Sequence, residues 1–191
     1  MDIILIRHGE TVSNHNKCFS EDNTVLTELG KEQMKRASRN LRNYKYDKVI
    51  ISQMDRAKES LEIMDIESPN IKVDKRANEF NFGILKGYSI NNTQNEYDAI
   101  FSKWYDDPID YILPEGESQR MLLERVKSLY YDLIKKDESV LIITHDGVIR
   151  AFLCALFDTP DIYFKLKSEN GSITIIRHED GYSRLYKYNE T

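Results

Sequence analysis

The stretch "IILIRHGET", from Ile3 to Thr11, places an arginine and a histidine directly after four apolar residues. A short apolar run of this kind is typical of a strand that is buried on both faces of a sheet. Gly9 predicts a turn immediately after the strand. No carboxylate follows until Glu10, so the strand ends in two cationic side chains, Arg7 and His8, without a partner in the run. The pattern indicates a place where the fold gathers positive charge.

Short apolar runs alternate with amphipathic segments along the rest of the chain. The pattern predicts strands over 3–6, 48–52, 71–74 and 139–144, helices over 27–43, 55–64, 118–135 and 147–156, and a closing strand pair over 172–178 and 182–188. Thr27 is the expected N-cap of the first helix. Alternating strands and helices predict an α/β fold with three layers, α/β/α, around a mainly parallel central sheet. A length of 191 residues suits one domain, 1–191.

The segment 76–118 interrupts this alternation. It contains one predicted helix, over 91–105, and is otherwise irregular. Long loops in compact domains often serve as active-site lids. We therefore expect a helical and loop insertion at 76–118 that covers the active site.

Bulk composition narrows the classes of partner. The net charge of −5 gives no reason to expect binding to nucleic acid or to a membrane surface. The apolar runs are shorter than a membrane span, and we expect no signal peptide before the first strand. Cys18 and Cys154 match no metal or redox spacing, so we expect free thiols in a cytoplasmic protein. An exposed edge strand near the C-terminus could support a homodimer.

The ends of the predicted parallel strands carry the chemistry. Ligands of open α/β sheets bind beyond the carboxyl ends of the strands. His145 follows the strand 139–144, and Arg56 lies one helical turn beyond the strand 48–52. A cluster of these residues with Arg7 and His8 is stable only if it binds an anion or if the histidines stay neutral. Arginine forks match phosphate oxygens, and a neutral imidazole is a nucleophile, so the cluster predicts a phosphate pocket whose histidine can attack phosphorus.

The helix predicted at 147–156 begins beside this cluster. Gly147 and Gly9 allow the backbone to approach a ligand closely. Asp146 or Thr144 is the expected cap of the helix, whose free N–H groups would then face the same anion.

Transfer of a phosphoryl group from an alkoxide also needs a proton donor. The segment "NEFNFG" offers Glu79 beside Phe80 and Phe82. Partial desolvation by these rings would raise the pKa of the carboxyl, as a general acid requires.

Five segments together resemble the histidine phosphatase superfamily, the phosphoglycerate mutase-like proteins. They are "LIRHGET" followed by Asn14, "LTELGKEQ", "SQMDRAKES", "NEFNFGILKG" and "THDGVIR", and they span 3–150 in the family's order. The resemblance implies that His8 is the nucleophile, which becomes phosphohistidine. It also implies that Arg7, Arg56 and His145 clamp the phosphoryl oxygens, that Asn14 adds a hydrogen bond, and that Glu79 is the acid and base. The family requires no metal and no cofactor.

Two branches of this family compete. The segment "FSKWYDDPIDYILPEGES" resembles the insertion of the α-ribazole phosphate phosphatases and the broad-specificity phosphatases, whereas mutases are longer. The resemblance therefore implies a phosphomonoesterase acting on a small metabolite, with α-ribazole phosphate, a sugar phosphate, phosphoserine and a phosphoglycerate all open. The altered loop Lys17–Thr24 and Asp146, where glycine is common in the family, bear on substrate choice.

Three other functions fit parts of the pattern. A metal hydrolase could use His8, His145, Asp146 and Glu79, although a cation beside two arginines is electrostatically unfavourable. A non-catalytic phosphate-binding module would keep the pocket without turnover, and a cofactor-dependent phosphoglycerate mutase would return the phosphoryl group to its substrate.

Overall fold

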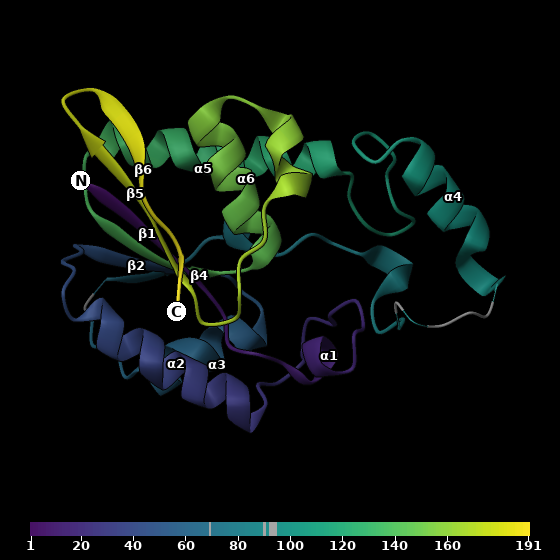
Figure 1. The fold of residues 1–191 in the computed structure, drawn as a ribbon, viewed down its shortest axis with the longest axis horizontal. Coiled ribbons are helices and arrows are strands. Elements are labelled where there is room, and N and C mark those ends of the chain that lie inside the picture. Colours follow the sequence, from purple (N-terminus) through teal and green to yellow (C-terminus); the bar gives the residue numbers. More distant parts are fainter. Residues whose placement is uncertain (69, 90, 92–94) are drawn as a thin grey trace.

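A six-stranded sheet runs through the middle of the protein between two layers of helices (Figure 1). In this computed structural model, residues 1–68, 70–89, 91 and 95–191 are described. The strand order is β3-β2-β4-β1-β5-β6. The first four strands in this order are parallel, whereas β5 runs antiparallel to both β1 and β6. The predicted α/β class, with three layers and a mainly parallel sheet, is confirmed.

The elements follow the predicted order. The strands are β1 (Asp2–Arg7), β2 (Lys48–Ile51), β3 (Ile71–Val73), β4 (Val140–Thr144), β5 (Ile173–Glu179) and β6 (Tyr182–Glu190). The α-helices are α1 (Val12–His15), α2 (Glu28–Leu41), α3 (Asp55–Met64), α4 (Asp98–Asp106), α5 (Gln119–Lys136) and α6 (Asp146–Phe157). Short 3-10 helices are η1 (Lys75–Ala77), η2 (Gly83–Leu85), η3 (Asn95–Tyr97) and η4 (Pro160–Lys165). The sequence pattern did not predict α1 or η4, which are too short to show a helical period.

Strand periodicity divides the core into two parts. In β1, Ile3 and Leu5 face one side of the sheet, and Ile4 and Ile6 face the other, because successive side chains alternate. The first side packs against α5 and α6, and the second against α2 and α3 (Figure 1). Both sides of β1 are therefore fully buried, which fixes where its carboxyl end and the residues after it must lie.

Helix capping agrees with the sequence for α2 and differs for α6. Thr27 accepts a hydrogen bond from the Gly30 N–H and caps α2 as predicted. The prediction that Thr144 or Asp146 caps α6 is wrong, since the N-cap residue is His145 and makes no capping bond. The Thr144 hydroxyl instead donates to the Ala77 carbonyl oxygen at a distance of 2.7 Å. This bond satisfies a buried carbonyl that would otherwise have no donor.

The segment 76–118 projects from the sheet and carries α4, which stands apart from the other helices (Figure 1). The helix predicted over 91–105 begins later, at Asp98, after the single turn η3, and no side chain caps its start. The part of this prediction at 92–94 lies outside the described residues. β3 is shorter than the predicted strand 71–74, because the Asp74 carboxylate turns to accept the Arg76 N–H and caps η1.

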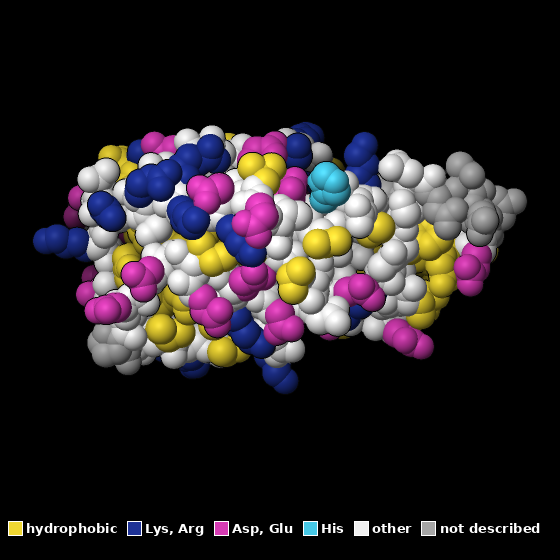
Figure 2. Space-filling view, turned by 90° about the horizontal axis from the view of Figure 1, so that it is seen from below, with side chains coloured by type: hydrophobic (Ala, Val, Ile, Leu, Met, Phe, Trp, Pro, Cys, Tyr) yellow, Lys and Arg dark blue, Asp and Glu magenta, His cyan; other side chains and the backbone are white. Residues whose placement is uncertain are grey.

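The surface is mixed in charge. Figure 2 shows lysine and arginine side chains interspersed with aspartate and glutamate over the face seen from below. Cys18 and Cys154 are free thiols. Across the described ranges, no helix combines the length and the apolar character that spanning a membrane demands. β6 forms one edge of the sheet, and the homodimer stays a prediction.

Candidate active site

Strand register brings the two histidines together. Arg7 of β1 pairs with Thr144 of β4, so the next residues, His8 and His145, leave the sheet side by side. Their rings lie 5.1 Å apart between centroids at an interplanar angle of 60°. Ile51 of β2 pairs with Ile143 of β4, which places Ser52 at the same edge. The parallel strands thus deliver these side chains to one rim, as expected from the sequence.

The His8 ring is buried and held in one tautomer. Its Nδ1 lies 2.7 Å from the Gly9 carbonyl oxygen, so Nδ1 carries the proton and donates. Its Nε2 lies 3.2 Å from the Nε–H of Arg56 and must accept, so this nitrogen keeps its lone pair. Burial, with Arg56 and Arg7 nearby, holds the pKa of His8 well below its usual value. His8 is therefore a neutral imidazole with an available nucleophilic nitrogen.

The His145 ring is held by a chain of polar contacts. Its Nδ1 accepts from the same Arg56 Nε–H at 3.2 Å, and its Nε2–H donates to the Ser52 hydroxyl at 2.8 Å. Ser52 in turn donates to the Asn78 side-chain oxygen at 3.0 Å. Burial and the Arg56 charge also hold the pKa of His145 well below its usual value. Both histidines are thus neutral, and Ser52 and Asn78 set the tautomer of the second.

Two arginines supply the positive charge. Arg56 is 1% exposed, and burial lowers its pKa to about 10. Its terminal nitrogens donate to the Glu21 carbonyl and to the Met54 sulfur, both at 3.0 Å. The Arg7 Nη1 donates to the Ser168 carbonyl, while its Nε is buried without a partner. Within the described ranges neither arginine pairs with a carboxylate, so their charge is available to an anion.

Asn170 links the Asn14 side chain to the backbone of His8 and so orients the Asn14 amide. The Asn14 side-chain oxygen accepts from the Thr11 N–H and from the Asn170 side-chain amide, each at 3.2 Å. Asn170 also donates to the His8 carbonyl at 3.1 Å. With its oxygen occupied twice, Asn14 has its amide nitrogen left to donate. No sequence pattern pointed to Asn170, which precedes Gly171 and has the character of an ordinary turn residue.

The Glu79 carboxyl lies at the start of α6. Its Oε1 accepts from the Phe80 N–H at 2.9 Å, and its Oε2 lies 3.5 Å from the Gly147 N–H. Burial raises the pKa of Glu79, and Asp146 adds to the effect, whereas the Phe80 N–H and the two arginines oppose it. Glu79 keeps a partly accessible surface, although protein atoms surround it closely. A carboxyl of this kind can hold a proton and release it.

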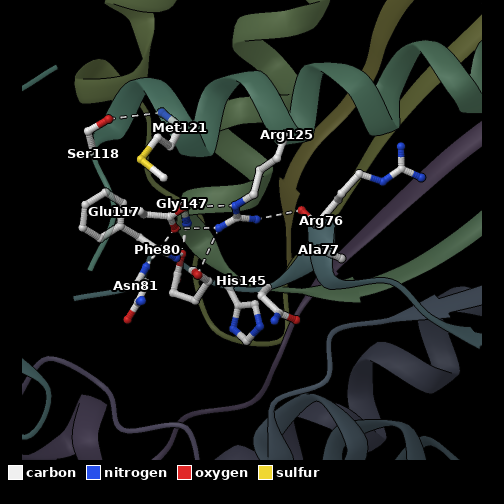
Figure 3. Close-up of polar contacts among 12 residues, drawn as sticks. Arg76, Ala77, Phe80, Asn81, Glu117, Ser118, Met121, Arg125, His145 and Gly147 are labelled. Carbon is white, nitrogen blue, oxygen red and sulfur yellow. Dashed lines mark hydrogen bonds and ion pairs between the residues drawn. The ribbon is translucent and has the colours of Figure 1, made fainter. Parts of the chain in front are cut away.

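Arg125 of α5 anchors the segment that carries Glu79 (Figure 3). Its guanidinium donates to the Arg76 carbonyl at 2.8 Å and to the Glu79 carbonyl at 3.1 Å. It also forms an ion pair with Glu117 at 2.8 Å, and Glu117 accepts from the Asn81 N–H at 2.8 Å. Sequence reasoning missed both members of this pair, since a helical arginine and a loop glutamate eight residues apart carry no local signal.

Gly147 makes room for the carboxyl. A Cβ atom at this position would lie 2.4 Å from Glu79 Oε1 and 2.9 Å from the Tyr163 hydroxyl. Gly147, for which phosphate binding stays a prediction, thus also serves packing, because its missing side chain leaves room for the Glu79 carboxyl and the Tyr163 hydroxyl. The close approach predicted at Gly9 is to the protein itself, since a Cβ there would lie 2.3 Å from the Gly30 carbonyl oxygen.

The predicted residues therefore gather at the carboxyl edge of the sheet, around the ends of β1 and β4. Their chemistry combines a neutral nucleophile, two cations without a carboxylate, an amide donor and a carboxyl with a raised pKa. In the described part of the chain, no three His, Cys, Asp or Glu side chains converge as metal ligands do.

Comparisons with known proteins agree with a phosphatase site. The sequence pattern of the histidine phosphatase superfamily (branch 1) matches residues 3–191. The chain is 25% identical to phosphoserine phosphatase 1 of Hydrogenobacter thermophilus, covering 99% of this chain and 92% of the relative. It is 30% identical to a phosphoglycerate mutase of Schizosaccharomyces pombe, and the match covers 93% of this chain and 90% of that protein. The crystal structure of the α-ribazole phosphatase from Shigella flexneri shares the fold, with a TM-score of 0.89 and 23% identity. The match covers 100% of this chain and 96% of that structure.

Proposed function

Since this chain belongs to the histidine phosphatase superfamily (branch 1) and is a phosphatase of that family, we propose that it hydrolyses small phosphomonoesters through a phosphohistidine at His8. The observation that carries the proposal is the pairing of a neutral His8, whose Nε2 keeps its lone pair, with the buried Arg56 and the half-buried Arg7, neither of which has a carboxylate partner among the described residues. A phosphate dianion supplies the missing negative charge.

The first step transfers the phosphoryl group to the enzyme. His8 Nε2 attacks phosphorus and forms the P–N bond while the P–O bond to the leaving alcohol breaks. The Glu79 carboxyl gives its proton to the leaving oxygen. Arg7, Arg56 and the Asn14 amide donate to the phosphoryl oxygens, and Gly147 lies beside Glu79. The clamp role predicted for His145 requires its Nε2–H to turn from Ser52 to a phosphoryl oxygen. The preset positions of these donors stabilise the charge that develops on these oxygens.

The second step returns the enzyme to its starting state. The Glu79 carboxylate accepts a proton from a water molecule, whose oxygen attacks phosphorus as the P–N bond breaks. Inorganic phosphate leaves, and His8 Nε2 and the Glu79 carboxyl regain their starting forms. The arginines carry the charge neutralisation, so the proposed cycle requires no metal and no cofactor.

Several finer assignments belong to this proposal. α-Ribazole phosphate and phosphoserine are the first substrates to test, because proteins similar to this chain carry those names. The segment 76–118 serves as the lid, consistent with its carrying Glu79 and lying outside the sheet. A cytoplasmic location fits the two free thiols.

A direct test compares wild type and His8→Ala with p-nitrophenyl phosphate and with butyl phosphate. Wild type should release inorganic phosphate and, after rapid quench with labelled substrate, carry an acid-labile phosphoryl group. His8→Ala should lose both. Equal rates for the two proteins would contradict the proposal and would favour a non-catalytic phosphate-binding module with adventitious turnover. Activity that a chelator abolishes would favour the metal hydrolase.

The mutase remains the second candidate because of the relative from Schizosaccharomyces pombe. Incubation with 3-phosphoglycerate and a bisphosphoglycerate primer separates the two. A phosphatase releases inorganic phosphate, whereas a mutase accumulates the isomer.

A further inference from the structure

The segment 166–172 joins η4 to β5 and runs past the carboxyl end of β1 (Figure 1). It forms neither helix nor strand, so no regular ladder of hydrogen bonds fixes its position. Two of its residues nevertheless contact the side chains that are proposed to bind phosphate. Whatever holds this segment therefore decides where those donors point.

Ser168 and Asn170 make these contacts. The Ser168 carbonyl accepts from Arg7 Nη1. The Asn170 amide nitrogen donates to the His8 carbonyl at 3.1 Å and to Asn14 Oδ1 at 3.2 Å. The segment thus orients the guanidinium of Arg7 and the amide of Asn14, two of the donors proposed for the phosphoryl oxygens.

Asp146, the first residue of α6, reaches across to this segment. Its Oδ1 accepts from the Ser168 N–H at 2.7 Å, and its carboxylate forms an ion pair with Arg150 one helical turn further along. Ser168 is fully buried, and the Asp146 side chain is 18% exposed. A carboxylate forms stronger hydrogen bonds than a neutral acceptor does. Asp146 therefore holds the backbone of the same residue whose carbonyl binds Arg7.

The neighbouring amides of the segment are held from β6. Tyr188 and Asn189 accept the N–H groups of the residues directly before and after Ser168, at 2.9 and 2.6 Å. The N–H of Ser168 itself is held by Asp146. Without Asp146 a buried N–H would lose its acceptor, so the backbone at Ser168 would have to move to satisfy it.

The Asp146 carboxylate supports Arg7 without binding it directly. Burial lowers the pKa of Arg7, and the nearby Asp146 charge opposes this shift. The carboxylate oxygens are taken by Ser168 and Arg150, and Arg7 Nε is buried with no partner among the described residues. A direct ion pair would occupy the N–H groups that a phosphate needs. Contact through Ser168 leaves them available.

Resting on the proposed function, we propose that Asp146 is a positioning residue for phosphate binding, which holds Ser168 by its N–H and thereby orients Arg7. Glycine, which is common at this position in the family, could not make this bond. A carboxylate near an anion site also repels the anion. Loss of the charge alone should therefore tighten phosphate binding, whereas loss of the hydrogen bond should weaken it, so the two roles predict changes of opposite sign.

The first test measures the affinity of wild type and Asp146→Ala for inorganic phosphate by calorimetry. The dissociation constant should rise about 10-fold in the variant, the size expected for one hydrogen bond to a charged group. For butyl phosphate and p-nitrophenyl phosphate, kcat/KM should fall by the same factor, mainly through KM, because both esters present the same phosphoryl oxygens. The matched control is Asp47→Ala, which removes a carboxylate that accepts the Ser139 N–H at 2.9 Å before β4 and should leave phosphate affinity unchanged.

Two double variants separate the hydrogen bond from the charge. Asp146→Asn and Asp146→Ala are each combined with Arg150→Met, because the Arg150 guanidinium would oppose the amide nitrogen of asparagine. Both remove the carboxylate, but asparagine keeps an oxygen for the Ser168 N–H. Compared with Arg150→Met alone, the asparagine variant should bind phosphate at least as tightly, and the alanine variant about 10-fold more weakly.

Each outcome decides the role of Asp146. Unchanged or tighter phosphate binding in Asp146→Ala would overturn the proposal, and so would an equal loss in both double variants. If the alanine variants do not fold, Asp146→Gly replaces them with the same expected loss. If wild type binds phosphate but hydrolyses neither ester, the proposed function fails, and the phosphate affinities still decide the proposal. A wild type that binds no phosphate would overturn both.

Discussion

His8 and His145 accept hydrogen bonds from the same Arg56 Nε–H, each at 3.2 Å. One guanidinium therefore orients both imidazoles and keeps both neutral, because a proton on either accepting nitrogen would face a buried cation. The arrangement places an unprotonated nucleophile beside uncompensated positive charge. These two conditions favour attack on a phosphate dianion. They also lower the stability of the folded protein when no phosphate is bound, so the site is functional at the expense of stability.

Replacing Arg56 by methionine should separate these two effects. Arg56 is buried and forms no ion pair with the residues that the structure describes, and a buried charge without a partner is destabilising. We expect Arg56→Met to lose about 10³-fold or more in kcat/KM. Without phosphate, its free energy of unfolding should be unchanged or higher by about 1–4 kcal/mol, measured in urea.

Added inorganic phosphate gives a second test of the role of Arg56. Wild type should gain thermal stability with increasing inorganic phosphate, and Arg56→Met should not. Arg36→Met, which removes an exposed arginine of α2, is the matched control and should behave as wild type. A phosphate-free Arg56→Met protein that is much less stable than wild type would show that Arg56 is mainly structural.

Ser52 should act through the tautomer of His145. Its hydroxyl accepts the His145 Nε2–H and is itself held by Asn78. In Ser52→Ala the ring loses this acceptor, and we expect kcat/KM to fall about 10-fold. Nitrogen NMR of the His145 ring should show the second tautomer appearing. Ser38→Ala, which removes a hydroxyl that donates to the Met64 carbonyl between α2 and α3, should change neither. A lower rate with an unchanged tautomer would assign Ser52 a different role.

The sequence was informative about the site wherever a residue follows a strand. Arg7 ends β1, and His8 and His145 directly follow β1 and β4, so strand register alone brings them together. Glu79 and Arg125 show the limit of this reasoning. Glu79 could be predicted from its aromatic neighbours, but the side chain that anchors its backbone comes from α5, nearly fifty residues away. Such a contact depends on how the irregular segment 76–118 packs, and no period or spacing encodes that packing.

Glu79→Gln should show an effect that depends on the leaving group. Glutamine cannot donate a proton, so butyl phosphate, whose alkoxide needs one, should lose about 10²–10⁴-fold in kcat/KM. p-Nitrophenolate leaves without protonation, and its release in the first turnover should be much less affected. Because the second step still lacks its base, stopped-flow traces should show a burst of p-nitrophenol followed by slow turnover. Equal losses for both esters, without a burst, would contradict the acid and base assignment.

The pH dependence of this reaction follows from the raised pKa of Glu79 and the lowered pKa of His8. Burial raises the pKa of Glu79, so the acid form persists to higher pH and kcat/KM should fall as pH rises through that pKa. In Glu79→Gln this alkaline limb should disappear. His8 has a lowered pKa, so the acid limb should lie below the ordinary histidine value near 6.5. A limb that persists unchanged in Glu79→Gln would belong to another group.

The same histidines predict how stability changes with pH. The folded pKa values of His8 and His145 are lowered, so the unfolded chain binds more protons as pH falls below about 6.5. The free energy of unfolding should therefore decrease on acidification, by about 1.4 kcal/mol per pH unit for each histidine that stays neutral. Glu79 opposes this trend, because its raised pKa makes the folded state take up a proton. Urea titrations of His8→Gln should show a slope shallower than that of wild type by about one proton, and equal slopes would contradict the neutral assignment.

Arg125 should position Glu79 without contacting the substrate. Arg125→Met removes the donor to the Glu79 carbonyl and leaves the buried Glu117 unpaired, so both activity and stability should fall. Adding Glu117→Gln removes the unpaired charge and should recover stability, whereas kcat for butyl phosphate should stay about 10-fold low because Glu79 is still not anchored. A burst with p-nitrophenyl phosphate should also appear in both variants, since His8 is untouched. Arg120→Met, which breaks an exposed ion pair with Asp110 at the start of the same helix, is the matched control. Recovery of kcat together with stability in the double variant would mean that Arg125 serves the fold alone.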